Sequence, residues 1–97
     1  MKNILENEKL TIYLEGEINS NNAEEVEKEI RSVMSGCKFN SLILDMEKLR
    51  YISSAGLRII VRLKQQYEEM KLVKVSEEVY DIFDMVGFQN VINIERI

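Results

Sequence analysis

The feature that most constrains the fold of this chain is a short apolar segment. A connection, two serines and a helical repeat follow it. Residues 42–44 read Leu-Ile-Leu and end at Asp45, and so short and apolar a run is typical of a strand buried on both faces. The connection 46–52 leads to Ser53 and Ser54. Serine favours helix starts because its hydroxyl accepts a hydrogen bond from an unpaired backbone N–H. The segment therefore predicts strand, loop and helix, with two hydroxyls at the start of the helix.

The remaining sequence predicts strands that alternate with helices. In residues 10–18 apolar and polar side chains alternate, the period of a half-buried strand. The expected elements in chain order are a hairpin of strands 1–5 and 10–18, a helix behind the capping residues 19–22, a strand at 42–45, a helix from Ser54 with apolar positions as far as Met70, a strand at 72–75, a helix from Ser76 to Gly87, and a strand at 91–94.

This order, ββαβαβαβ, predicts the fold class. Strands separated by helices indicate a partly parallel sheet with right-handed crossovers. We therefore expect an α/β fold, with a mixed β-sheet of four to five strands and about three to four helices. The length of 97 residues suits a single domain spanning residues 1–97.

Composition excludes several classes of function. The formal net charge of −4 disfavours nucleic acid as a partner. No apolar run is long enough to span a bilayer and the N-terminal residues lack a signal-peptide core, so we expect a cytoplasmic protein without membrane contact. The absence of histidine excludes a Ser-His-Asp triad, and the single cysteine, Cys37, excludes an internal disulfide or a cluster of thiolate ligands. No metal and no cofactor is expected.

The helix that starts near Ser54 has an unusually wide apolar face. At roughly 100° per residue its apolar positions cover an arc of about 200°, wider than one core-facing stripe. A helix packed between two neighbours would explain this width. The alternative is that Leu57 and Val61, at the edge of the arc, are partly exposed and contact another protein.

The two serines permit three interpretations. One of them caps the helix and does nothing more, which is the commonest use of this pattern. A nucleophile would need Lys48 or Lys64 as its base, because histidine and the Gly-x-Ser-x-Gly elbow are absent. A phosphate acceptor would gain roughly −1.5 to −2 charges where backbone N–H groups and the helix dipole favour an anion. A partner docked on that surface would then lose affinity.

These motifs resemble those of STAS domains, specifically bacterial anti-sigma factor antagonists. The resemblance covers nearly the whole chain in the right order. It rests on Gly16-Glu17-Ile18-Asn19 at the end of an early strand, the apolar strand that ends at Asp45, the segment Ser53-Ser54-Ala55-Gly56-Leu57, and Gly87-Phe88 before the last strand. Ser53 stands where the family commonly has an aspartate, and Asn19 replaces an aspartate of the early motif.

The resemblance implies a partner-switching regulator that is not an enzyme. The family's phosphorylated serine corresponds to Ser54, with Ser53 as the alternative acceptor. The unphosphorylated protein would bind an anti-sigma factor that is also a serine kinase, and so control sigma-factor-dependent transcription. Phosphorylation at Ser54 would release the kinase, and a phosphoserine phosphatase would reset the switch.

The surface that docks the partner is expected around the start of the same helix. Its expected residues are Ser53, Gly56, Leu57, Arg58 and Val61, and Gly56 would admit the backbone of the partner because it lacks a side chain. The alternative function is a STAS scaffold or assembly subunit that never gains phosphate and mediates protein–protein interaction. A small enzyme is a third hypothesis.

Overall fold

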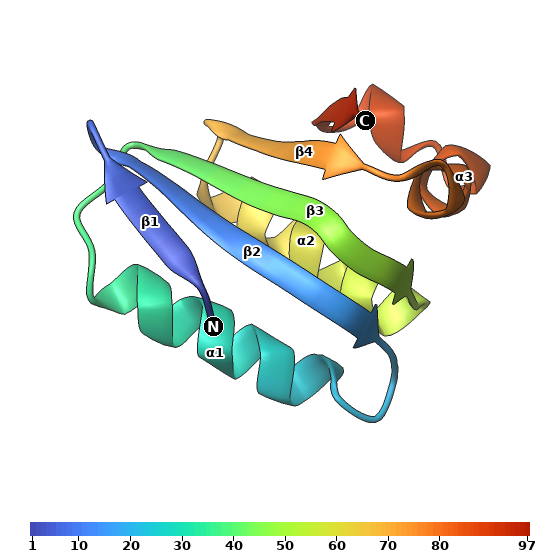
Figure 1. Cartoon of the computed structure of the whole chain (residues 1–97), viewed down its shortest axis with the longest axis horizontal. Helices are drawn as coiled ribbons and strands as arrows, with labels where there is room; N and C mark the ends of the chain where they lie inside the picture. Colours follow the sequence, from blue (N-terminus) through green and yellow to red (C-terminus); the bar gives the residue numbers. More distant parts are fainter.

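A five-stranded mixed sheet organises the chain, and the computed structural model describes residues 1–97 (Figure 1). The strands lie side by side in sequence order; β1 is antiparallel to β2, and the other neighbours are parallel. This confirms the predicted fold class and order. The elements are β1 (Asn3–Glu6), β2 (Lys9–Ile18), α1 (Ala23–Ser35), β3 (Ser41–Ile52), α2 (Ser54–Gln66), β4 (Met70–Val75), α3 (Glu77–Met85), the 3₁₀ turn η1 (Phe88–Asn90) and β5 (Asn93–Arg96).

The predicted hairpin of β1 and β2 is confirmed. Its two connecting residues, Asn7 and Glu8, have φ values of 51° and 63°. Two successive left-handed residues match the twist of the flanking strands, which is why such tight turns close hairpins. The hairpin supplies the only antiparallel pair of the sheet.

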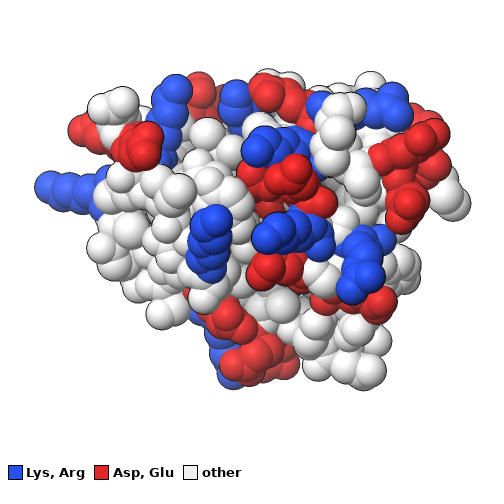
Figure 2. Space-filling view, in the orientation of Figure 1, with Lys and Arg blue, Asp and Glu red and all other residues white.

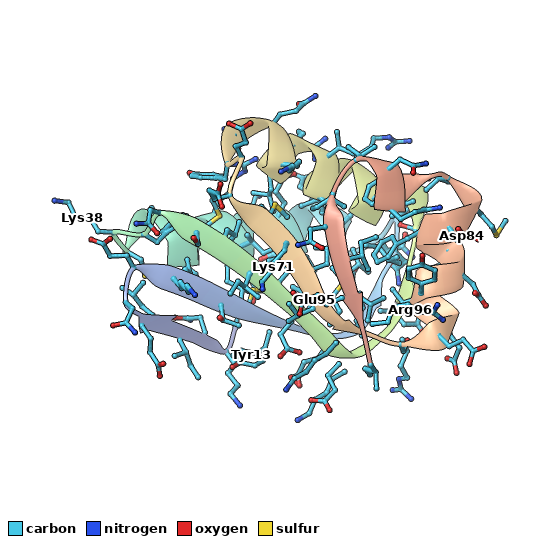
Figure 3. All side chains as sticks on the ribbon, turned by 90° about the horizontal axis from the view of Figure 1, so that it is seen from above. Tyr13, Lys38, Lys71, Asp84, Glu95 and Arg96 are labelled. Carbon is cyan, nitrogen blue, oxygen red and sulfur yellow. The ribbon has the colours of Figure 1, made fainter.

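Helices α1 and α2 cover one face of the sheet (Figure 1). Each parallel connection advances by one strand in the same direction, so right-handed crossovers place both helices on the same side. On this side every second residue of the strands is buried, among them Leu10, Ile12, Leu42 and Leu44. The opposite face of the sheet carries polar side chains, such as Lys71 of β4, whose ammonium lies 2.9 Å from Glu95 of β5 (Figure 3).

Strand β3 is longer than predicted, because residues 46–52 continue the strand instead of forming a loop. They pair with β2 as far as Ile18 and Ile52, through two irregularities in the register. Strand β4 accompanies β3 only as far as Asp45, and α3 lies beside the part of β3 beyond it. Beyond Asp45, where β4 no longer pairs with β3, Glu47, Lys48 and Arg50 are exposed. These polar residues explain why the sequence suggested a loop at 46–52.

Two other predicted boundaries are wrong. Helix α2 ends at Gln66, and Tyr67 already has an extended backbone, so Tyr67 and Met70 do not extend the apolar face of the helix. The last strand begins at Asn93 instead of residue 91, because η1 carries the chain through Val91: the N–H of Ile92 donates to the carbonyl oxygen of Phe88 at 3.0 Å.

Charges are interspersed on the surface shown in Figure 2, without an extended patch of one sign. Between α1 and α2 they form a small network. The carboxylate of Glu27 accepts hydrogen bonds from Arg62 at 2.6 Å and from Arg31 at 3.0 Å. The hydrogen bond from Arg62, followed by that from Arg31, lowers the pKa of Glu27 despite the opposing effect of partial burial. The network therefore links the two helices that cover the sheet.

We expect the contribution of this network to stability to depend on pH. The folded-state pKa of Glu27 lies below its unfolded value, so the stabilisation is fully present above the ordinary glutamate pKa of about 4.3 and is lost as the pH falls through the lowered value. The urea midpoint of Glu27→Gln should lie below that of the wild type at neutral pH and converge with it in acid. A difference independent of pH would contradict this.

None of the helices is long and apolar enough to cross a membrane.

Candidate functional site

The junction between β3 and α2 is fixed by Ser53, which ends the strand and caps the helix. Its N–H donates to the carbonyl oxygen of Ile18 at 2.8 Å, and its own carbonyl oxygen accepts from Leu57 at 2.9 Å. Its hydroxyl oxygen accepts from the N–H of Gly56 at 3.4 Å. The predicted helix start is therefore confirmed, with the hydroxyl of Ser53 engaged in the cap.

Ser54 is the first residue of α2 and, unlike Ser53, it is accessible to a modifying enzyme. Its side chain is exposed, and its hydroxyl has no hydrogen-bond partner within the protein. The first turn of α2 carries no acidic residue, whereas the first turns of α1 and α3 each carry two glutamates. The N–H groups of a first helical turn lack intrahelical acceptors, so this surface favours an added anion.

Gly56 has a role inside the fold, and its contact with a partner stays a prediction. It is buried, and a Cβ atom placed on it would lie 2.5 Å from Cγ1 of Ile52 and 2.9 Å from Cγ2 of Ile18. These two isoleucines end the paired strands β2 and β3. The absence of a side chain at Gly56 therefore lets the start of α2 pack closely against the ends of both strands.

The other residues expected in the docking surface have different degrees of exposure. Leu57 is only 9% exposed and belongs to the core, so its predicted partial exposure is wrong. Val61 is half-buried and packs partly against the core. Arg58 is exposed, as are Ser54 and Arg62. The wide apolar face of α2 thus belongs to a helix that packs against both the sheet and α1.

The turn between β2 and α1 lies next to this junction and was not predicted as part of the site. The side-chain oxygen of Asn19 accepts from the N–H groups of Asn21 and Asn22, and that of Asn22 accepts from the N–H of Asn19. Behind this turn, between α1 and α2, lies a hollow of about 280 Å³, lined by Ser20, Ala23, Glu24, Glu27, Ala55, Arg58, Ile59 and Arg62. The four capping residues at 19–22 were the only signal in the sequence for this turn.

The two lysines considered as bases for a nucleophilic serine do not lie at the start of α2. Lys64 is in the last turn of α2, where its ammonium donates to the carbonyl oxygen of Glu68. Lys48 lines a separate hollow with Tyr13, Asp45 and Lys74. A general base must lie within hydrogen-bond reach of its nucleophile, so this geometry does not support a serine–lysine pair.

Replacing Ser53 with alanine is expected to destabilise the fold by about 1 kcal/mol, the usual cost of losing a helix N-cap. Ser54→Ala should cost much less, because the hydroxyl of Ser54 is exposed and makes no hydrogen bond. Urea unfolding of the two variants measures the difference. Equal losses of stability would contradict the assignment of Ser53 as the cap.

Comparison with known proteins gives the family. The STAS domain pattern matches residues 2–96, and the chain belongs to the STAS domain family.

Three relatives illustrate the likeness. A candidate anti-sigma factor antagonist, BtrV of Bordetella bronchiseptica, is 34% identical over 86 residues, covering 84% of this chain and 73% of BtrV. A structure of another candidate antagonist, from Thermotoga maritima, superposes with a TM-score of 0.85 at 18% identity, covering 99% of this chain and 86% of that one.

The third relative is SpoIIAA, an anti-sigma factor antagonist of Bacillus known in two states. Its unphosphorylated form has a TM-score of 0.73 at 19% identity, covering 94% of this chain and 83% of SpoIIAA. Its phosphorylated form has a TM-score of 0.65 at 18% identity, covering 94% and 86%. At 18–19% identity, the two structures show only that this chain shares the fold of SpoIIAA.

Proposed function

We propose that this chain is an anti-sigma factor antagonist that switches partners through phosphorylation of Ser54. The observation that supports this most strongly is the exposed, unpartnered hydroxyl at the first position of α2. Membership of the STAS family and the likeness to BtrV support the same role. SpoIIAA, which shares the fold, exists in phosphorylated and unphosphorylated forms.

Ser54 is the proposed acceptor and Ser53 the lesser alternative, because their hydroxyls have different environments. A kinase must reach the hydroxyl with the terminal phosphoryl group of ATP, and Ser54 is exposed whereas Ser53 is half-buried. The hydroxyl of Ser53 accepts the N–H of Gly56, so its modification would disturb the cap. A phosphate on Ser54 would instead add charge at the favourable end of α2 and leave the cap in place.

The proposed docking surface consists of Ser53, Ser54, Arg58 and Val61, with Ala55 between them. In the unmodified state it presents hydroxyl and small apolar groups beside one guanidinium. Phosphorylation would place a group of roughly −1.5 to −2 charges in its centre. A partner that excludes water there would have to bury that charge, so an anti-sigma factor serine kinase would be released and a phosphoserine phosphatase would restore binding. In this role the protein acts in the cytoplasm and is not an enzyme.

The test is to incubate the protein with ATP and each candidate serine-kinase anti-sigma factor from the same genome, and then to measure its intact mass. We expect a gain of one phosphate in the wild type and in Ser53→Ala, and no gain in Ser54→Ala. A gain that persists in Ser54→Ala and disappears in Ser53→Ala would move the acceptor to Ser53.

The same mixtures separate the other functions. Stable binding of a kinase without any change of mass would favour the scaffold or assembly subunit. Turnover of a small molecule, without phosphate gain or kinase binding, would favour an enzyme. Either result would contradict the proposed switch.

A further inference from the structure

Arg58 is a free cation one helical turn after Ser54. Both residues lie on the regular part of α2, four positions apart. At this spacing side chains share one face of a helix and their Cβ atoms are about 5–6 Å apart, and an anion that precedes a cation has the favourable orientation. The guanidinium of Arg58 is exposed and makes no ion pair or hydrogen bond within the protein.

The neighbouring charges leave Arg58 free for a new partner. Arg62, one turn further along α2, is held by Glu27 at 2.6 Å. Glu24 lines the same hollow as Arg58, but its carboxylate lies 3.7 Å from the ammonium of Lys28 and forms no ion pair with Arg58. Arg58 is thus the one uncommitted cation on the helical face that begins at Ser54.

From this geometry we infer that Arg58 binds the phosphate of phosphorylated Ser54 within the same helix. This inference rests on the proposed modification of Ser54 and adds the residue that recognises it. A guanidinium can give two parallel N–H···O hydrogen bonds to a phosphate. Phosphorylation would then change the docking surface in two ways: it adds an anion and it also withdraws the only free guanidinium from the hollow between α1 and α2.

The pairing has a consequence for the partner. In the unmodified protein the guanidinium of Arg58 stays available to an acidic group of the docked protein. In the phosphorylated protein that acidic group would lose its counter-charge and would face a phosphate, which strengthens the repulsion. The switch therefore needs no movement of the backbone, only a change of partner by one side chain.

The test needs no kinase. The protein is produced with phosphoserine incorporated at position 54 during translation, and the second ionisation of the phosphate, near pH 6 in the absence of a partner, is followed by ³¹P NMR. The titration is repeated in Arg58→Ala, in Arg58→Lys and in Arg50→Ala. Arg50 serves as the matched control, because it is also exposed and unpaired but lies on β3.

We expect Arg58→Ala to raise the midpoint of the titration by about 0.2–0.4 pH unit, the shift that corresponds to one helical ion pair. Arg58→Lys should raise it by less, and Arg50→Ala should leave it unchanged within about 0.1 unit. Equal midpoints in the wild type and Arg58→Ala, or equal shifts in Arg58→Ala and Arg50→Ala, would overturn the inference. Failure of every kinase to modify Ser54 would refute the proposed function and leave this titration intact.

Discussion

Phosphoserine at position 54 is expected to weaken binding of the anti-sigma factor by about 30-fold or more. Burying an unpaired charge in an interface costs about 2–5 kcal/mol, and each 1.4 kcal/mol corresponds to a factor of about ten in affinity. Ser54 is exposed at the first position of α2, so a partner docked on the proposed surface would meet the phosphate. Calorimetric titration of the partner with the unmodified and the phosphoserine-containing protein measures the change.

Two controls make that titration specific. Ser54→Ala should weaken binding by less than about tenfold, because it removes one neutral hydroxyl from the docking surface and adds no charge. Phosphoserine placed at Ser32, which is exposed on α1, should change the affinity much less. If phosphoserine at 54 and at 32 weakened binding equally, the docking surface would not be the one proposed.

The second large effect is expected from Gly56→Ala, which should destabilise the fold by about 1–2 kcal/mol. A methyl group at this position would meet the side chains of Ile52 and Ile18 at 2.5 and 2.9 Å. Overpacking of a core costs about 1–3 kcal/mol, and the better helix propensity of alanine offsets at most about 1 kcal/mol of it. The strain lies at the start of α2, so the environment of Ser54 should change as well. Urea unfolding measures the loss.

Gly36→Ala is the matched substitution. Its Cβ atom would have no neighbour closer than 3.7 Å, from the carbonyl oxygen of Val33, and its φ of −89° suits any residue. We expect a change in the free energy of unfolding of less than about 0.5 kcal/mol. Similar losses in the two variants would show that the contact of Gly56 with the strands is looser than the structure indicates.

Much of this architecture could be predicted because most of the apolar patterns are typical of a single kind of secondary structure. The alternation in residues 10–18 and the helical spacing behind Ser76 place their elements correctly. Serine before a helical repeat correctly predicted the caps, since Ser53 and Ser76 both accept an N–H three residues later. These signals act within a few residues, so tertiary contacts do not change them.

The errors arise where exposure depends on elements that are distant in the sequence. Polar residues in 46–52 suggested a loop, but they are exposed because β4 leaves the side of β3 beyond Asp45. Leu57 was wrongly expected to be partly exposed, because periodicity does not tell whether one or two neighbours cover a helix. Gly56 has a role that only the side chains of Ile18 and Ile52 reveal. The hollow beside Arg58 likewise depends on α1.

Phosphorylation of Ser54 is expected to change the charge of one surface and to leave the fold unchanged. The most direct test compares amide ¹H–¹⁵N NMR spectra of the unmodified protein and the protein with phosphoserine at position 54. We expect changes confined to residues 53–62 and to the adjacent residues 19–24, with the resonances of β1, β4 and β5 unchanged. Changes that spread across the sheet would mean that the phosphate acts by rearranging the domain, and would contradict the account.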